Sequence, residues 1–193
     1  KVFLLSDEAM FEQIDSFERL AYLPYGEIAD DLEPLVDAAI RAKLEIVRQD
    51  PFEHEGVRSF LNLGHTLGHA IERVTGMSHG ESVAWGLAAM LEASKEYGLN
   101  AATAYRIRCQ LCPLLIPVPS RMSMSAIRNA MRTDKKNRSE KLRSVVLEEL
   151  RHPRLTERLS LDGWIEAFDK VQGEFYHREV TVSLGEPVPV SIR

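Results

Sequence analysis

The feature of this chain that most constrains its fold is the recurrence of apolar residues every three or four positions, in stretches separated by proline and glycine. This spacing places hydrophobic side chains along one face of an α-helix. Proline and glycine end one helix and permit the turn into the next. The pattern therefore predicts a mainly α fold. The predicted helices cover residues 6–20, 28–47, 59–74, 79–97, 101–111, 125–132 and 162–171.

Two segments show strand patterns instead. Residues 142–147 read as a single strand, and residues 179–193 alternate apolar and polar side chains on either side of Gly185-Glu186-Pro187. Alternation around a short turn is typical of a β-hairpin. We therefore expect a helical domain over residues 1–178 and a small C-terminal β-hairpin over residues 179–193.

Composition excludes several classes of protein. The 193 residues carry a net charge of −5 and are 45% hydrophobic, which suits one globular domain and is unfavourable for binding nucleic acid. No apolar run is long enough to span a membrane, and no signal peptide is visible. We expect a cytoplasmic protein, and the Lys1 start suggests a piece of a longer chain. Cys109 and Cys112 are expected to be thiols at a helix end, because a four-cysteine zinc site would need a second pair.

Three of the six histidines, His65, His69 and His79, lie within 15 residues. On a helix His65 and His69 project from one face, and His79 stands where the next helix is expected to begin, a position that favours neutral imidazole. These residues are either metal ligands or ordinary structural histidines. Gly64 and Gly68 precede the first two, which indicates close approach of a ligand or of a neighbouring helix.

A metal site would also need a further group, for which Glu72 and Glu81 are the nearest carboxylates in sequence. Arg58, Asn62 and the run Asp134–Arg138 offer donors for an anionic substrate. The alternative for that run is a solvated turn before the strand.

These motifs together resemble the C-terminal metal-binding domain of the 3-dehydroquinate synthase family, within the sugar-phosphate cyclases. The resemblance covers roughly residues 20–171 in family order. It rests on Ile40–Lys43, Gly56–Arg58, Leu61–Ala70, His79–Gly86 and Asp134–Lys136.

The resemblance implies a divalent metal, zinc or cobalt, bound by His65 and His79. It implies catalytic roles for His69, Arg58 and Lys135, with His69 facing the substrate phosphate. It also implies an anionic sugar-phosphate substrate, an NAD cofactor and a homodimer. The remaining substrate-binding positions that it implies are Lys43, Asn62 and Lys136.

The chain departs from the family at Leu20–Gly26, which contains Tyr22-Leu23-Pro24 where the family has a metal-binding glutamate and a lysine. The chain also contains no Gly-x-Gly, so NAD is expected to bind to a missing domain, on a longer chain or on a partner. We therefore expect a cyclase domain that is inactive alone. The alternative is a degenerate family member that acts as an interaction or regulatory module.

Overall fold

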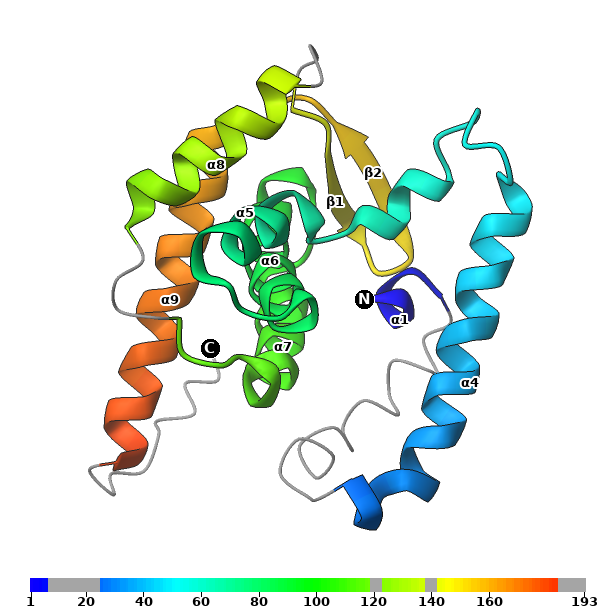
Figure 1. The fold of residues 1–193 in the computed structure, drawn as a ribbon, viewed down its shortest axis with the longest axis horizontal. Coiled ribbons are helices and arrows are strands. Elements are labelled where there is room, and N and C mark those ends of the chain that lie inside the picture. The colour runs from blue at the N-terminus through cyan, green and yellow to red at the C-terminus, as the bar shows by residue number, and fades with distance from the viewer. Residues whose placement is uncertain (7–24, 119–122, 138–141, 184–193) are drawn as a thin grey trace.

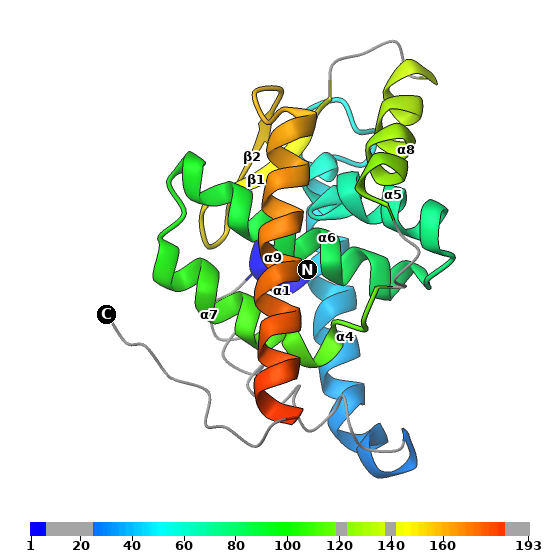
Figure 2. The ribbon, with the colours of Figure 1, turned by 90° about the vertical axis from the view of Figure 1, so that its left-hand side faces the viewer.

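The computed structural model describes residues 1–6, 25–118, 123–137 and 142–183 as a helical assembly with one small sheet (Figures 1 and 2). The mainly α prediction is confirmed. Single-turn 3₁₀ segments connect several elements: η2 (Arg58–Asn62), η3 (Lys95–Tyr97) and η4 (Cys112–Leu114). The helices are α1 (Val2–Leu5), α4 (Tyr25–Gln49), α5 (His65–Thr75), α6 (His79–Ser94), α7 (Ala101–Leu111), α8 (Met124–Asn137) and α9 (Leu161–Ser183), and the strands are β1 (Ser144–Glu149) and β2 (His152–Thr156).

Helix α6 forms the centre of the described structure (Figure 2). Every residue from Ser82 to Ser94 is buried, because α5, α7, α9 and β1 pack around it. A helix that is apolar on all sides belongs in a protein core. At its N-terminus, Ser78 and Glu81 form a capping box, in which each side chain accepts a hydrogen bond from the other's backbone N–H. The first residue of α6, His79, is therefore held at a fixed point.

Glycines bring α5 and α6 into backbone contact. A Cβ on Gly86 would lie 2.0 Å from the carbonyl oxygen of Gly64, and a Cβ on Gly68 would lie 3.1 Å from the Cα of Val83. Gly64 also has a φ of +77°, which other residues rarely adopt. Helix packing therefore accounts for both glycines that precede the histidines.

The same glycine corrects one prediction. The sequence pattern predicted one helix over residues 59–74, but the chain forms η2, passes through an extended Leu63 and a left-handed Gly64, and only then enters α5. This break places His65 at the first position of a helix, instead of within one.

The sheet is a two-stranded antiparallel hairpin in the middle of the chain, with Ser144 opposite Thr156. Strand β1 was expected over residues 142–147. Strand β2 was not predicted; its five residues include Pro153, a residue that is unfavourable within strands. The turn also supports α1, since the backbone N–H of Arg151 donates to the carbonyl oxygen of Leu4 at 3.0 Å.

Both late helices are longer than their apolar patterns predicted. Helix α8 continues to Asn137, so Lys135 and Lys136 lie on its last turn and not in a turn before the strand. Helix α9 continues to Ser183, so the hairpin predicted for 179–193 is wrong over residues 179–183.

Some predictions fall on residues that the structure does not describe. The helix expected over residues 6–20 and the break at Tyr22–Pro24 fall almost wholly in residues 7–24, and the rest of the predicted tail lies in residues 184–193.

Candidate metal centre

A buried carboxylate organises the connector that leads to the histidines. Asp50 follows the end of α4 and accepts backbone N–H groups of His54 at 2.8 Å, Glu55 at 3.3 Å and Arg58 at 3.4 Å. Burial raises the pKa of the Asp50 carboxyl, but these backbone donors outweigh burial and hold the pKa below its usual value. The ionised Asp50 thus fixes where η2 begins.

His65, His69 and His79 meet where α5 faces the N-terminus of α6. One ligand nitrogen from each lies within 4.8 Å of those from the other two. The ring centroid of His65 lies 5.2 Å from that of His69 and 5.2 Å from that of His79. The centroids of His69 and His79 are 5.7 Å apart. Helical spacing brings the first two together, and the close contact of α5 with α6 adds the third.

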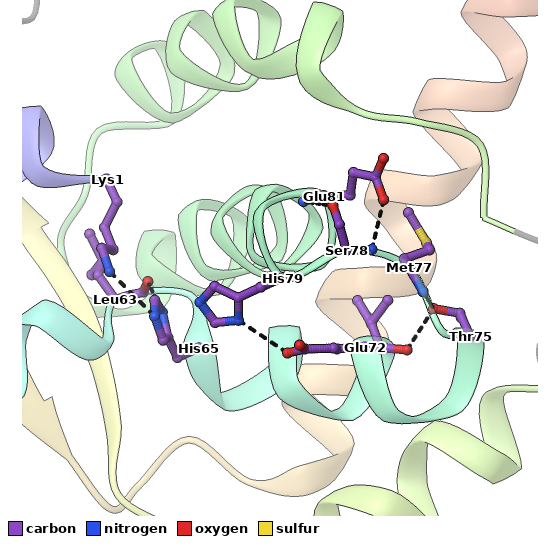
Figure 3. Close-up of polar contacts among 10 residues, drawn as sticks. Lys1, Leu63, His65, Glu72, Thr75, Met77, Ser78, His79 and Glu81 are labelled. Atoms are coloured by element: carbon purple, nitrogen blue, oxygen red, sulfur yellow. Dashed lines mark hydrogen bonds and ion pairs between the residues drawn. The ribbon is translucent and has the colours of Figure 1, made fainter. Parts of the chain in front are cut away.

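Hydrogen bonds fix the tautomers of two of these rings. Nδ1 of His65 lies 3.1 Å from the carbonyl oxygen of Leu63, and Nδ1 of His79 lies 3.1 Å from a carboxylate oxygen of Glu72. Figure 3 shows the His79 ring between His65 and Glu72. Both acceptors require a proton on Nδ1, so the lone pair of each neutral ring is on Nε2. Carbonyl and carboxylate partners of this kind orient metal-binding histidines in many proteins.

The surroundings keep His65 neutral. Burial, and then the charge of Lys1, lower the pKa of His65 to about 4. The ammonium of Lys1 donates to Nε2 of His65 at 3.3 Å. Burial and the charge of Lys43 in turn lower the pKa of Lys1. The centre therefore combines a neutral imidazole with the side chain of Lys1.

This donor set fits a divalent transition metal. Neutral imidazole nitrogens bind zinc and cobalt well, and His69 and His79 are exposed, so a bound ion would remain open to a substrate. Glu72 and Glu81 do not join the group, because Glu72 orients His79 and Glu81 completes the capping box. Among the described residues, the ligand atoms that converge here are histidine nitrogens.

No contact with this centre is described for the other predicted site residues. Arg58 and Asn62 are exposed at the two ends of η2, directly before the histidine helix, and a guanidinium nitrogen of Arg58 lies 3.5 Å from the carbonyl oxygen of Pro51. Lys43 is exposed on α4. Lys135 and Lys136 are on α8, which packs on α5.

Sequence patterns missed two participants. Nothing in the local sequence links Lys1 to His65, which are 64 positions apart. The role of Glu72 was missed because Glu72 was considered only as a ligand; its position three residues after His69, on the same helix, was the available signal.

An apolar cavity of about 290 Å³ shares Lys1 with this centre. It lies between α1, α6 and α7, and most of its walls are aliphatic, including Val83, Leu87 and Ile107. Such walls do not suit a phosphorylated sugar, so a substrate of that kind would reach the histidines from the exposed side.

None of the described helices combines the length and the apolar character needed to cross a bilayer.

Comparison with known proteins identifies relatives of the chain. Residues 1–137 match the protein family described as 3-dehydroquinate synthase C-terminal. The chain is 38% identical over 122 residues to 3-dehydroquinate synthase of Pyrobaculum aerophilum, covering 61% of this chain and 35% of that protein. It is 31% identical over 150 residues to the enzyme of Rippkaea orientalis, covering 74% and 40%. The chain thus spans about two fifths of such relatives.

Solved structures share the fold. A 2-epi-5-epi-valiolone synthase from Streptomyces hygroscopicus, with NAD⁺ and Zn²⁺ bound, aligns with a TM-score of 0.68 at 17% identity, covering 90% of this chain and 49% of that one. A 2-deoxy-scyllo-inosose synthase, complexed with carbaglucose-6-phosphate, NAD⁺ and Co²⁺, aligns with a TM-score of 0.59 at 22% identity, covering 73% and 41%. At these identities the likeness concerns the fold.

Proposed function

The chain belongs to the 3-dehydroquinate synthase C-terminal family, and from this we propose that it is the metal- and substrate-binding part of a sugar-phosphate cyclase. Such an enzyme eliminates phosphate from a sugar phosphate and forms a carbocycle. The observation that carries the proposal is the convergence of His65, His69 and His79 beside Lys1.

His65 and His79 would hold the metal through Nε2, because the Nδ1 proton of each is already donated to a fixed acceptor. A bound zinc or cobalt ion would polarise alcohol and ketone oxygens of the substrate as a Lewis acid. Glu72 keeps the His79 ring oriented. The closely packed α5 and α6 hold both rings in place.

The chain's cationic and amide side chains would bind the anionic groups of the substrate, since ammonium and guanidinium groups bind phosphate and carboxylate strongly. His69, which is exposed beside the two ligands, would transfer a proton near the leaving phosphate. Lys43 would bind the carboxylate. The groups assigned to the remaining contacts are Arg58, Asn62, Lys135 and Lys136.

The relatives are more than twice as long as the part of them that this chain matches. We assign NAD to a nucleotide-binding domain outside these 193 residues. The chain alone should therefore release no phosphate from a heptulosonate phosphate supplied with NAD. Turnover by this polypeptide without a partner would contradict the assignment.

Substrate binding tests the proposal directly. Calorimetry with zinc-loaded protein and a heptulosonate phosphate should show binding that Arg58→Met weakens about tenfold, through loss of one charge-assisted contact of about 1.4 kcal/mol. His152→Ala is a matched control, because His152 is exposed on the hairpin. Equal affinity in all three proteins, or no binding, would refute the proposed substrate site.

An interaction or regulatory module is the second candidate, and Tyr22-Leu23-Pro24 favours it because this segment lacks the carboxylate found in the family. A well-folded protein that binds no metal would support it. In either case we also propose a homodimer, for which sedimentation showing only monomer would be the contrary result.

A further inference from the structure

We propose that Cys109 and Cys112 form a reversible redox site, in which a low-molecular-weight disulfide oxidises the two thiols to one internal disulfide. The inference does not depend on the proposed function, since it concerns neither the histidines nor a sugar phosphate. These are the two cysteines of the chain, and both are thiols in the structure.

Helical spacing points the two thiols the same way. Cys109 lies in the last turn of α7, and Cys112 begins η4 three positions later with φ −47° and ψ −45°, so the helical path continues through both. Residues three apart share one face of a helix, and their Cα atoms lie about 5 Å apart. A disulfide needs Cα atoms about 4.4 to 6.8 Å apart, so the backbone already meets this requirement.

The change from α to 3₁₀ geometry brings the side chains closer. In an α-helix, Cβ atoms three residues apart are about 5 to 6 Å from each other, whereas a disulfide needs about 3.5 to 4.5 Å. The backbone N–H of Cys112 donates to the carbonyl oxygens of both Arg108 and Cys109, so the helix is already tightening here. In 3₁₀ geometry, side chains three residues apart eclipse each other. Pro113 has no N–H, so no helical hydrogen bond from that residue must break when the turn closes.

Both thiols border one small cavity between α6, α7 and α9. The cavity measures about 20 Å³, and its walls also include Ala88, Arg108 and Glu174. This volume holds one water-sized group, so either sulfur has room to rotate toward the other. Both cysteines are half-buried, so a small disulfide in solution can reach them.

A buried donor on the same cavity is left without an acceptor. The Arg108 side chain is 8% exposed, and its terminal nitrogens pair with Glu92 at 2.5 Å and with Glu174 at 3.1 Å. Among the described residues, nothing accepts the Nε–H of Arg108. An unsatisfied buried N–H is costly and calls for an explanation, of which a redox role is one. The negative charge that forms on sulfur during exchange supplies an acceptor in this cavity.

The exchange balances without any other reagent. One cysteine thiolate attacks a sulfur of the small disulfide, whose S–S bond breaks as one thiolate leaves and a mixed disulfide remains on the protein. The second cysteine thiolate then attacks the protein-bound sulfur and expels the other small thiolate. The protein loses two electrons and two protons, and the small disulfide gains both and becomes two thiols. Because the helical turn must tighten to close the bond, excess thiol should reverse the reaction readily.

Mass spectrometry of the intact full chain, after reaction of the reduced protein with glutathione disulfide, tests the proposal. We expect the wild type to lose both thiols and two hydrogen atoms and to retain no glutathione, and dithiothreitol should restore both thiols. Cys109→Ser and Cys112→Ser should each keep one glutathione as a mixed disulfide, because no second thiol can expel it.

A matched control changes only the spacing of the thiols. Combining Leu111→Cys with Cys112→Ser places the second thiol two positions from Cys109, where helical side chains do not face each other. Its internal closure should be at least about tenfold slower than that of the wild type. Circular dichroism would verify that each variant folds.

A wild type that keeps both thiols, or that stops with glutathione bound, would overturn the inference. A disulfide between two chains would overturn it as well, because the two sulfurs of one chain would then not meet. Equal closure rates in the wild type and in the spacing control would refute the role given to the helical turn.

Discussion

Replacing Gly86 with alanine tests whether the contact between α5 and α6 holds the histidines together. The new Cβ would lie 2.0 Å from the carbonyl oxygen of Gly64 and 2.9 Å from the backbone nitrogen of Gly68. Ordinary contacts begin near 3.4 Å, so the two helix backbones must separate by more than an ångström at this point. Both obstructing atoms belong to the backbone, which cannot turn away as a side chain can.

The cost follows from known effects of overpacking. A clash of this severity costs about 3 kcal/mol or more, while alanine regains about 1 kcal/mol of helix propensity. We expect Gly86→Ala to lower the free energy of unfolding by about 2 to 4 kcal/mol. Separating the helices should also move His79 away from His65, so Co²⁺ affinity should fall with stability.

Urea denaturation, followed by tryptophan fluorescence, measures this change well because Trp85 and Trp164 are fully buried. Gly173→Ala is the matched control. Gly173 lies within α9, and a Cβ added there would meet no atom within 4 Å, so alanine should stabilise the protein by about 0.5 to 1 kcal/mol. If Gly86→Ala is as stable as Gly173→Ala, the packing argument is refuted.

Three further predictions concern the charges around the histidines. Glu72→Gln should weaken Co²⁺ binding about tenfold in calorimetry, because the orienting acceptor of His79 loses its charge; unchanged affinity would count against this role. Lys1→Met should strengthen Co²⁺ binding severalfold, because an ammonium that donates to Nε2 of His65 no longer competes with the ion; weaker binding would contradict this. In metal-free protein, the unfolded state binds more protons at His65 than the folded state between the folded pKa of about 4 and the ordinary value of about 6.5. Stability should therefore fall as pH drops from 6.5 toward 4, and His65→Gln should flatten this slope in urea titrations at several pH values; a slope unchanged by the substitution would refute the assignment.

Local patterns predicted most helices of the fold. The spacing of apolar residues predicted α7 over the residues observed, and the end of α4 before Asp50-Pro51 agrees with the sequence. The break at Gly64 was missed, because the apolar pattern runs through it. At this break Gly64 lies against Gly86, a contact between residues 22 positions apart that periodicity does not record.

The grouping of the three histidines was predictable from local patterns. His65 and His69 share one face of a helix, and His79 begins the next helix, so we expected the three side chains to lie together. The position of Lys1 depends on how α1 packs beneath the hairpin turn through Arg151 and Leu4. Such long-range placement requires the assembled fold, as do the partners that fix each tautomer.

The zinc content of the chain decides whether the histidine cluster is a metal centre. Elemental analysis by mass spectrometry, after loading with zinc and extensive dialysis, measures that content. We predict a single equivalent of zinc per chain in the wild type and in His152→Ala, and almost none in His79→Ala. A wild type that retains no zinc, or a His79→Ala variant that retains as much as the wild type, would contradict the assignment of a metal to these histidines.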